Sequence, residues 1–130
     1  MSLEEKEIKY KLFTKGLDAF NKHDFYDAHE HWEDLWSDYR LQDAKFIQAL
    51  IQLSVGYFHI SNRNINGANG LLKKCMPKFI LFKPAQRGLN VDKIIISIEA
   101  SLKKLDSIEN ITEFDWSLVP KLEIDELRTV

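Results

Sequence analysis

Residues 43–62 read DAKFIQALIQLSVGYFHISN, and this stretch decides the fold. Apolar side chains point in almost every direction around a helix drawn through it, and Gln48, Gln52, Ser54 and His59 are the main interruptions. A helix that is apolar nearly all round belongs in the centre of a bundle, because it needs neighbours on every side. The stretch falls short of the roughly 20 consecutive apolar residues that cross a bilayer, so we expect no membrane span.

On both sides of this stretch, apolar residues recur at spacings of three and four rather than two, which is the period of helices. The predicted helices cover about 4–22, 24–39, 43–62, 68–79 and 91–105, with a turn at 64–67 and a loop at 83–90. Pro77 should kink or split the fourth helix, because proline lacks a backbone donor. We therefore predict an all-α protein, a compact bundle of about five helices with an irregular C-terminal tail over about 107–130.

The chain has 130 residues, one cysteine and a formal net charge of −2. No repeat of 20–50 residues is apparent, so we expect one helical-bundle domain over 1–130. Cys75 has no partner for a disulfide, and its place on an apolar face favours an inert core thiol. The first residues alternate charges and lack the apolar core of a signal peptide, which favours a cytoplasmic protein.

The predicted helix over 24–39 is amphipathic. Its acidic outer face lies opposite an apolar arc that we expect to be buried. The main members of this arc are Phe25, Ala28, Trp32, Leu35 and Trp36.

Polar side chains lie at the edges of the apolar faces of the second and third predicted helices. On the second helix, His29 and Glu33 are one turn apart and Glu30 lies further round. On the third helix, a polar stripe is formed by Gln48, Gln52 and His59. Buried polar groups need hydrogen-bond partners, so our first interpretation is a His/Glu/Gln network that fixes the register of the two helices. The protein would then be a structural or interaction module.

The same groups could instead perform chemistry, because imidazoles and carboxylates act as general acids and bases. His29, Glu30, Glu33 and His59 are therefore candidate catalytic residues of a hydrolytic or acid–base enzyme. A divalent metal is a variant of this alternative, since His29-Glu30-x-x-Glu33 is similar to the zinc motif HExxH. Glu33 replaces the second histidine of that motif, so His59 would have to complete the site. We predict no other cofactor, and whether the protein is an enzyme stays open.

Charge is unevenly distributed, with a net −5 in residues 1–43, +7 in 44–91 and −4 in 92–130. The basic segment 63–87 begins beside a predicted helix start, whose free N–H groups could receive an anion. The candidate binding residues are Gln48, Gln52, Arg63, Asn64 and Gly67. Phosphate or nucleic acid is thus a second alternative partner, although the acidic total and the lack of a nucleic-acid motif argue against nucleic acid. The sequence leaves a homo-oligomer open.

Two further stretches carry a family resemblance. Residues 20–36 contain AHEHWEDLW after FNKHDFYD, and residues 46–53 read FIQALIQL. Together with His59 and Asn64-x-x-Gly67-Ala68, they resemble the prokaryotic and plastid family catalogued as domain of unknown function number 309, over about residues 12–82. The matching positions are His29, Glu30, Glu33, Trp36, Gln52, His59, Asn64 and Gly67. The resemblance implies a mainly helical bundle and no established activity; the C-terminal extension and Pro77 depart from the family pattern.

Overall fold

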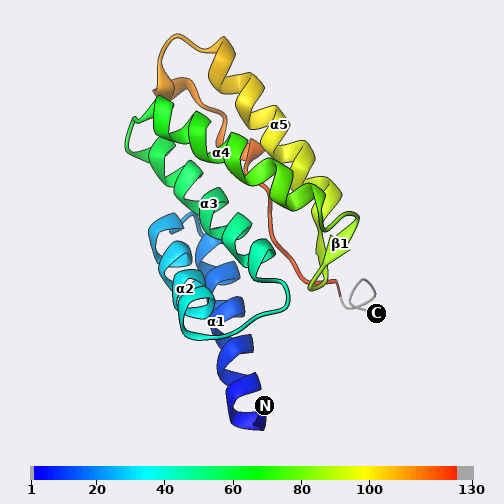
Figure 1. The fold of residues 1–130 in the computed structure, drawn as a ribbon. Coiled ribbons are helices and arrows are strands. Elements are labelled where there is room, and N and C mark those ends of the chain that lie inside the picture. Colours follow the sequence, from blue (N-terminus) through cyan, green and yellow to red (C-terminus); the bar gives the residue numbers. More distant parts are fainter. Residues whose placement is uncertain (1, 126–130) are drawn as a thin grey trace.

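The structure, a computed structural model, describes residues 2–125. The all-α prediction is confirmed, because five α-helices make up most of the described chain (Figure 1). They are α1 (Leu3–Asn21), α2 (Phe25–Asp38), α3 (Ala44–Ser61), α4 (Ile65–Ile80) and α5 (Val91–Ser107). A short hairpin of β1 (Ala85–Gln86) and β2 (Leu89–Asn90) joins α4 to α5, and the tail contains two 3-10 turns, η1 (Ile111–Glu113) and η2 (Trp116–Leu118).

Successive helices pack on one another, so α3 lies between α2 and α4 and holds the centre of the bundle (Figure 1). Its side chains Phe46, Leu50, Leu53 and Tyr57 are completely buried. The prediction from residues 43–62 is therefore confirmed. After α5 the chain turns back and runs along the bundle towards the hairpin (Figure 1).

The helical hairpin α1–α2 and the helical hairpin α3–α4 are built alike at positions 40 residues apart. Both turns place one non-glycine residue in the left-handed region, His23 with φ 62° and Arg63 with φ 59°. The next backbone N–H closes each turn onto the preceding helix, from Asp24 to the Ala19 carbonyl at 2.9 Å and from Asn64 to the His59 carbonyl at 2.8 Å. A hydrogen bond of this kind satisfies a carbonyl that the helix end leaves open.

The packing inside the two hairpins follows the same spacing. A Cβ added to Gly16 would lie 2.0 Å from Trp32 Nε1, and one added to Gly56 would lie 2.9 Å from Leu72 Cδ2. Trp32 and Leu72 are both fully buried. Each glycine thus lets a large side chain of the second helix lie against the first helix. The sequence showed no repeat because the two hairpins share this pattern of size and turn geometry, and few identical residues.

The segment between α4 and α5 was predicted as a loop, and the structure corrects this to a β-hairpin with a two-residue turn. Ala85 pairs with Asn90, and Gln86 pairs with Leu89 in antiparallel register. The two turn residues, Arg87 and Gly88, both have positive φ, as a type I′ turn requires. The sequence did not predict this turn because Arg87 occupies a position where type I′ turns usually have asparagine or glycine.

Three local expectations also need correction. The predicted turn at 64–67 is the first turn of α4, and this helix runs unbroken through Pro77 to Ile80 instead of splitting. Pro77 lies in the last turn of α4, and the N–H that it lacks removes only one backbone hydrogen bond from the helix. Trp36 was expected in the core but is 39% exposed, because it lies at the edge of the arc centred on Trp32 and Ala28.

Candidate functional site

The turn between α3 and α4 brings together three of the candidate residues, His59, Asn64 and Gly67. The Asn64 side chain accepts a hydrogen bond from the Gly67 N–H at 2.9 Å and lies 3.4 Å from Nδ1 of His59. A Cβ on Gly67 would lie 2.7 Å from the Asn64 amide nitrogen and 2.9 Å from the His59 ring. Asparagine therefore caps α4, and glycine leaves room for the imidazole. These positions have a structural explanation in the turn.

The predicted network between α2 and α3 is not formed at two of its atoms. Within residues 2–125, Nδ1 of His29 and Oε1 of Gln52 are buried and have no hydrogen-bond partner. Instead, the His29 ring lies 5.5 Å from the ring of Tyr26, which in turn lies 5.5 Å from Phe58 of α3. Aromatic packing thus joins the helices here, and this corrects the hydrogen-bonded interpretation for His29 and Gln52.

The remaining candidates on α2 and α3 do not form a cluster that could bind a metal ion. Glu30 is exposed, and Glu33 and Gln48 are half-buried. Among residues 2–125, no group of three His, Cys, Asp or Glu side chains is arranged to hold a metal ion. The catalytic roles of His29, Glu30, Glu33 and His59 stay predictions from the sequence.

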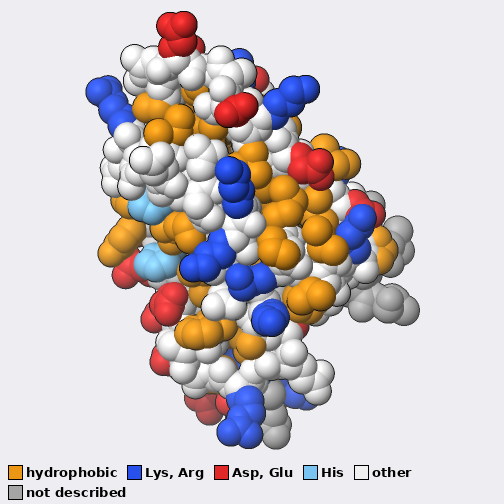
Figure 2. Space-filling model, turned by 45° about the horizontal axis from the view of Figure 1, so that its top comes forward, with side chains coloured by type: hydrophobic (Ala, Val, Ile, Leu, Met, Phe, Trp, Pro, Cys, Tyr) orange, Lys and Arg blue, Asp and Glu red, His pale blue; other side chains and the backbone are white. Residues whose placement is uncertain are grey.

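Basic side chains form a band down the middle of the face in Figure 2, with apolar side chains on both sides of it. Two members of the basic segment 63–87 have acidic partners: Lys83 lies 3.6 Å from Asp92, and Arg87 binds Asp43. At the start of α4, the Gly67 N–H is already bound by Asn64. Two of the cationic side chains and one of the backbone N–H groups that could bind an anion therefore already have partners.

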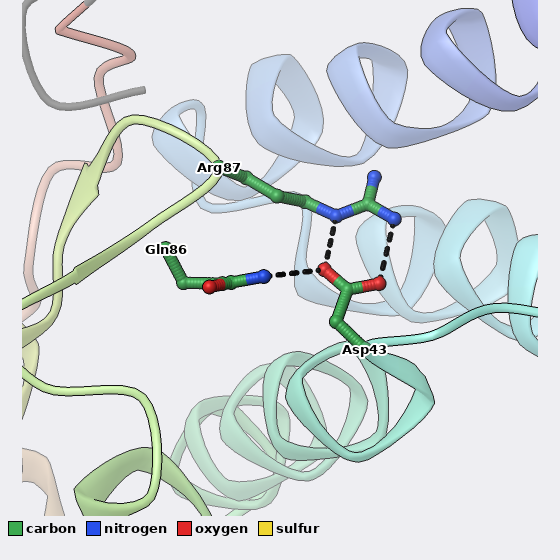
Figure 3. Close-up of polar contacts among 3 residues, drawn as sticks. All are labelled: Asp43, Gln86 and Arg87. Carbon is green, nitrogen blue, oxygen red and sulfur yellow. Dashed lines mark hydrogen bonds and ion pairs between the residues drawn. The ribbon is translucent and has the colours of Figure 1, made fainter. Parts of the chain in front are cut away.

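Figure 3 shows how Arg87 holds the start of α3. Its Nε and Nη2 donate to the two carboxylate oxygens of Asp43 at 2.6 and 2.9 Å, and Gln86 Nε2 adds a third bond at 3.0 Å. The guanidinium also lies 4.8 Å from the centre of the Phe13 ring on α1. Burial acts to raise the pKa of Asp43, but these hydrogen bonds and the arginine charge outweigh it and lower the pKa below 3.8. This bidentate pair therefore ties the β-hairpin to α1 and α3.

The last part of the described chain lies against the helical bundle, in a groove that the sequence did not predict. We call residues 114–125 the tail segment. The amide of Asn21, the last residue of α1, donates to the Leu122 carbonyl at 2.9 Å and accepts from the Leu122 N–H at 2.8 Å. The Asp125 N–H donates to the Gly88 carbonyl at 2.8 Å. A side-chain amide that binds both main-chain groups of one residue recognises backbone, whatever the side chain is.

Aromatic rings bind the first half of the tail segment. Trp116 stacks on Phe25 with ring centres 6.1 Å apart and lies 5.9 Å from His23. Phe114 packs against Trp116 at 5.1 Å and against Tyr57 of α3 at 6.4 Å. The floor of this tail groove is thus formed by the α1–α2 turn and by α3.

The wall on the α5 side is open. A groove of about 860 Å³ runs between α5 and the tail segment, lined by Ile94, Ser97 and residues 117–125 among others. The Tyr57 hydroxyl of α3 is hydrogen-bonded to Ser101 of α5 at 2.8 Å, and burial raises the pKa of this phenol. The tail segment therefore has hydrogen-bonded and aromatic contacts to the rest of the bundle, and a groove stays open between it and α5.

No local signal could have identified this groove. Asn21 falls near the end of the predicted helix over 4–22, and its partner Leu122 is 101 positions away. The contact uses the main chain of Leu122, so it has no signature in the side chains.

None of the helices within residues 2–125 combines the length and the hydropathy of a membrane span. Residues 13–71 match the family model described as Domain of unknown function (DUF309), which confirms the predicted resemblance over a shorter range than 12–82. The match includes α2, α3 and the turns that follow α1 and α3, and it ends before the β-hairpin, α5 and the tail segment. A comparison with curated proteins found no match.

Proposed function

We propose that this protein is an interaction module built from stacked helical hairpins, and that its function is binding rather than catalysis. The observation that carries this proposal is the recurrence of turn geometry and glycine packing in α1–α2 and α3–α4, 40 residues apart. Repeat proteins stack such units and use the surface along successive units to bind extended partners.

The candidate residues support this proposal through the roles they have in the fold. His59, Asn64 and Gly67 build the turn that aligns α4 with α3. His29 packs on Tyr26, which in turn packs on Phe58 of α3.

A selection from random extended peptides displayed on phage tests the proposal. The folded protein should enrich peptides that bind with micromolar dissociation constants, as measured by fluorescence anisotropy. An immobilised surface without protein is the control for the selection. Failure to enrich any peptide above that control would contradict a binding function.

A second measurement addresses the enzymatic alternative. Chromogenic esters, amides and phosphoesters are incubated with the wild-type protein and with Glu33→Gln, and Asp34→Asn, an exposed position on the same helix, serves as the matched control. The proposal expects no turnover by any of the three proteins. Turnover that is lost in a folded Glu33→Gln variant, and kept in Asp34→Asn, would overturn it in favour of acid–base catalysis.

A further inference from the structure

The tail segment is bound as a peptide ligand would be. Residues 120–125 have no regular secondary structure. Leu122 is buried while its neighbours Lys121 and Glu123 are 73% and 69% exposed. One inward side chain between two outward ones is the pattern of an extended strand lying in a groove.

The contacts that hold this strand would accept other sequences. Asn21 binds the N–H and the carbonyl of Leu122, and Gly88 accepts from the N–H of Asp125. These bonds depend on the backbone alone, so any extended peptide could form them. Selectivity comes from burial of the Leu122 side chain and from the aromatic surface of Phe25 and Tyr57.

The tail segment also has local structure of its own. The Asp115 carboxylate accepts from the Ser117 N–H at 3.0 Å and from its hydroxyl at 2.6 Å. Just before the tail segment, the Asn110 side chain accepts equivalent bonds from the N–H and the hydroxyl of Thr112 at 3.0 and 2.9 Å. Two capped turns therefore precede the extended part, and neither cap depends on the bundle.

The geometry points to a peptide-binding site in the tail groove, which the tail segment occupies in cis as a displaceable inhibitor. The partner is a segment of another protein that binds in extended form, with an aromatic pair and a leucine-like anchor spaced as Phe114, Trp116 and Leu122 are. This inference rests on the proposed binding function and gives it a site, a ligand chemistry and a regulation. Since a tethered segment is present at about millimolar effective concentration, a partner binds well only when the tail is released.

Hydrogen exchange on the wild-type protein gives a test that needs no variant. The amides of Leu122 and Asp125 should exchange at least about tenfold faster than amides in the centre of α3, because the tail leaves the groove without unfolding of the bundle. Equal protection would show that the tail leaves only on global unfolding, and this result would overturn the inference.

Binding of a labelled peptide with the sequence of residues 113–125, EFDWSLVPKLEID, tests the site itself. In the full chain, Leu122→Ala weakens the resident tail, so it should bind the peptide at least about tenfold more tightly than the wild type does. Asn21→Ala removes both main-chain bonds from the resident tail and from the peptide alike, so it is added to the Leu122→Ala chain, and this double variant should bind the peptide more weakly than Leu122→Ala alone does. Asn66→Ala, at an exposed position on α4, is the matched control and should bind as the wild type does.

Every outcome of this experiment can be assigned. If Leu122→Ala is folded and gains no affinity, or if the double variant with Asn21→Ala binds the peptide as tightly as Leu122→Ala alone does, the tail groove is not the site. A Leu122→Ala chain that cannot fold would identify the tail as part of the core and overturn the inference as well. Native mass spectrometry showing a dimer that Leu122→Ala abolishes would assign the groove to the tail of a second copy. Selected peptides whose affinity is the same for Leu122→Ala and for the double variant with Asn21→Ala bind elsewhere, and they would leave the proposed function standing and refute this site.

Discussion

Replacing Gly16 by alanine should destabilise the protein more than any other glycine-to-alanine change on a helix. The new Cβ would lie 2.0 Å from Nε1 and 2.5 Å from Cδ1 of the Trp32 indole, so the ring must move. Trp32 is fully buried, and its Nε1–H donates to the Phe13 carbonyl at 3.1 Å. Overpacking costs about 1–3 kcal/mol, and a buried donor that loses its acceptor costs about 1–3 kcal/mol more. We expect a total loss of about 3–5 kcal/mol.

Two other glycines provide matched controls. At Gly56 the nearest atom to an added Cβ is Leu72 Cδ2 at 2.9 Å, the end of a flexible side chain, so Gly56→Ala should cost about 1–2 kcal/mol. At Gly70, inside α4, nothing lies within 4 Å of the added Cβ. Gly70→Ala should therefore stabilise the protein by about 0.5–1 kcal/mol, because alanine restricts the unfolded chain and favours a helix.

Urea unfolding at 25 °C measures these changes, followed by tryptophan fluorescence and by far-UV circular dichroism. A small domain has a free energy of unfolding of about 5–15 kcal/mol, so the expected loss at Gly16 lies well above the error. A Gly16→Ala protein within about 1 kcal/mol of the wild type would refute the reasoning from the Trp32 contact. So would a Gly70→Ala protein that is as unstable as Gly16→Ala.

Three further predictions concern individual side chains. Asp43→Asn should lower the free energy of unfolding at pH 7 by about 2 kcal/mol, because it removes the charge that Arg87 binds. The fold lowers the pKa of Asp43 below its ordinary value of 3.8, so this stabilisation is present above that pH and is lost as the pH falls through the folded-state pKa. Urea unfolding of both proteins across pH 2–7 should show that the difference between their free energies of unfolding shrinks only in acid. A difference that stays constant with pH would contradict the pairing. Arg63→Gly should stabilise the protein by about 0.5–1 kcal/mol in thermal unfolding, since φ is 59° there, and a decrease in stability would contradict the claim of backbone strain. Burial raises the pKa of Cys75 to about 12, so iodoacetamide at pH 8 should modify it only as fast as the protein unfolds, and rapid labelling of the native protein would contradict this.

The helices could be predicted because the periodicity of apolar residues is a local property. The pattern of residues 43–62 identified α3 and its central place, and the spacing after Val91 identified α5 despite its run of isoleucines. The start of α4 and the β-hairpin were predicted less accurately, and each lies beside an arginine with positive φ, Arg63 and Arg87. Side-chain type alone did not reveal that these arginines adopt positive φ.

Among the candidate site residues, the sequence singled out positions that the fold uses, and it assigned some of them the wrong partners. The structure brings His59 together with Asn64 and Gly67 in one turn, whereas the sequence placed His59 among the candidate catalytic residues and the other two among the candidate binding residues. His29 and Gln52 were expected to bond across two helices, and the helical wheel gives the direction of each side chain but not the distance to its neighbour.

By itself, the sequence determined the helical class, the order of the helices and the central position of α3, because these follow from the hydrophobic pattern within each segment. Only the tertiary structure decided that Asn21 binds the main chain of Leu122 and that Arg87 pairs with Asp43. These residues are 101 and 44 positions apart, and packing of the whole bundle brings them together. The physical reason is that periodicity specifies which face of a helix is buried, whereas pairing between distant groups depends on how all the buried faces fit at once.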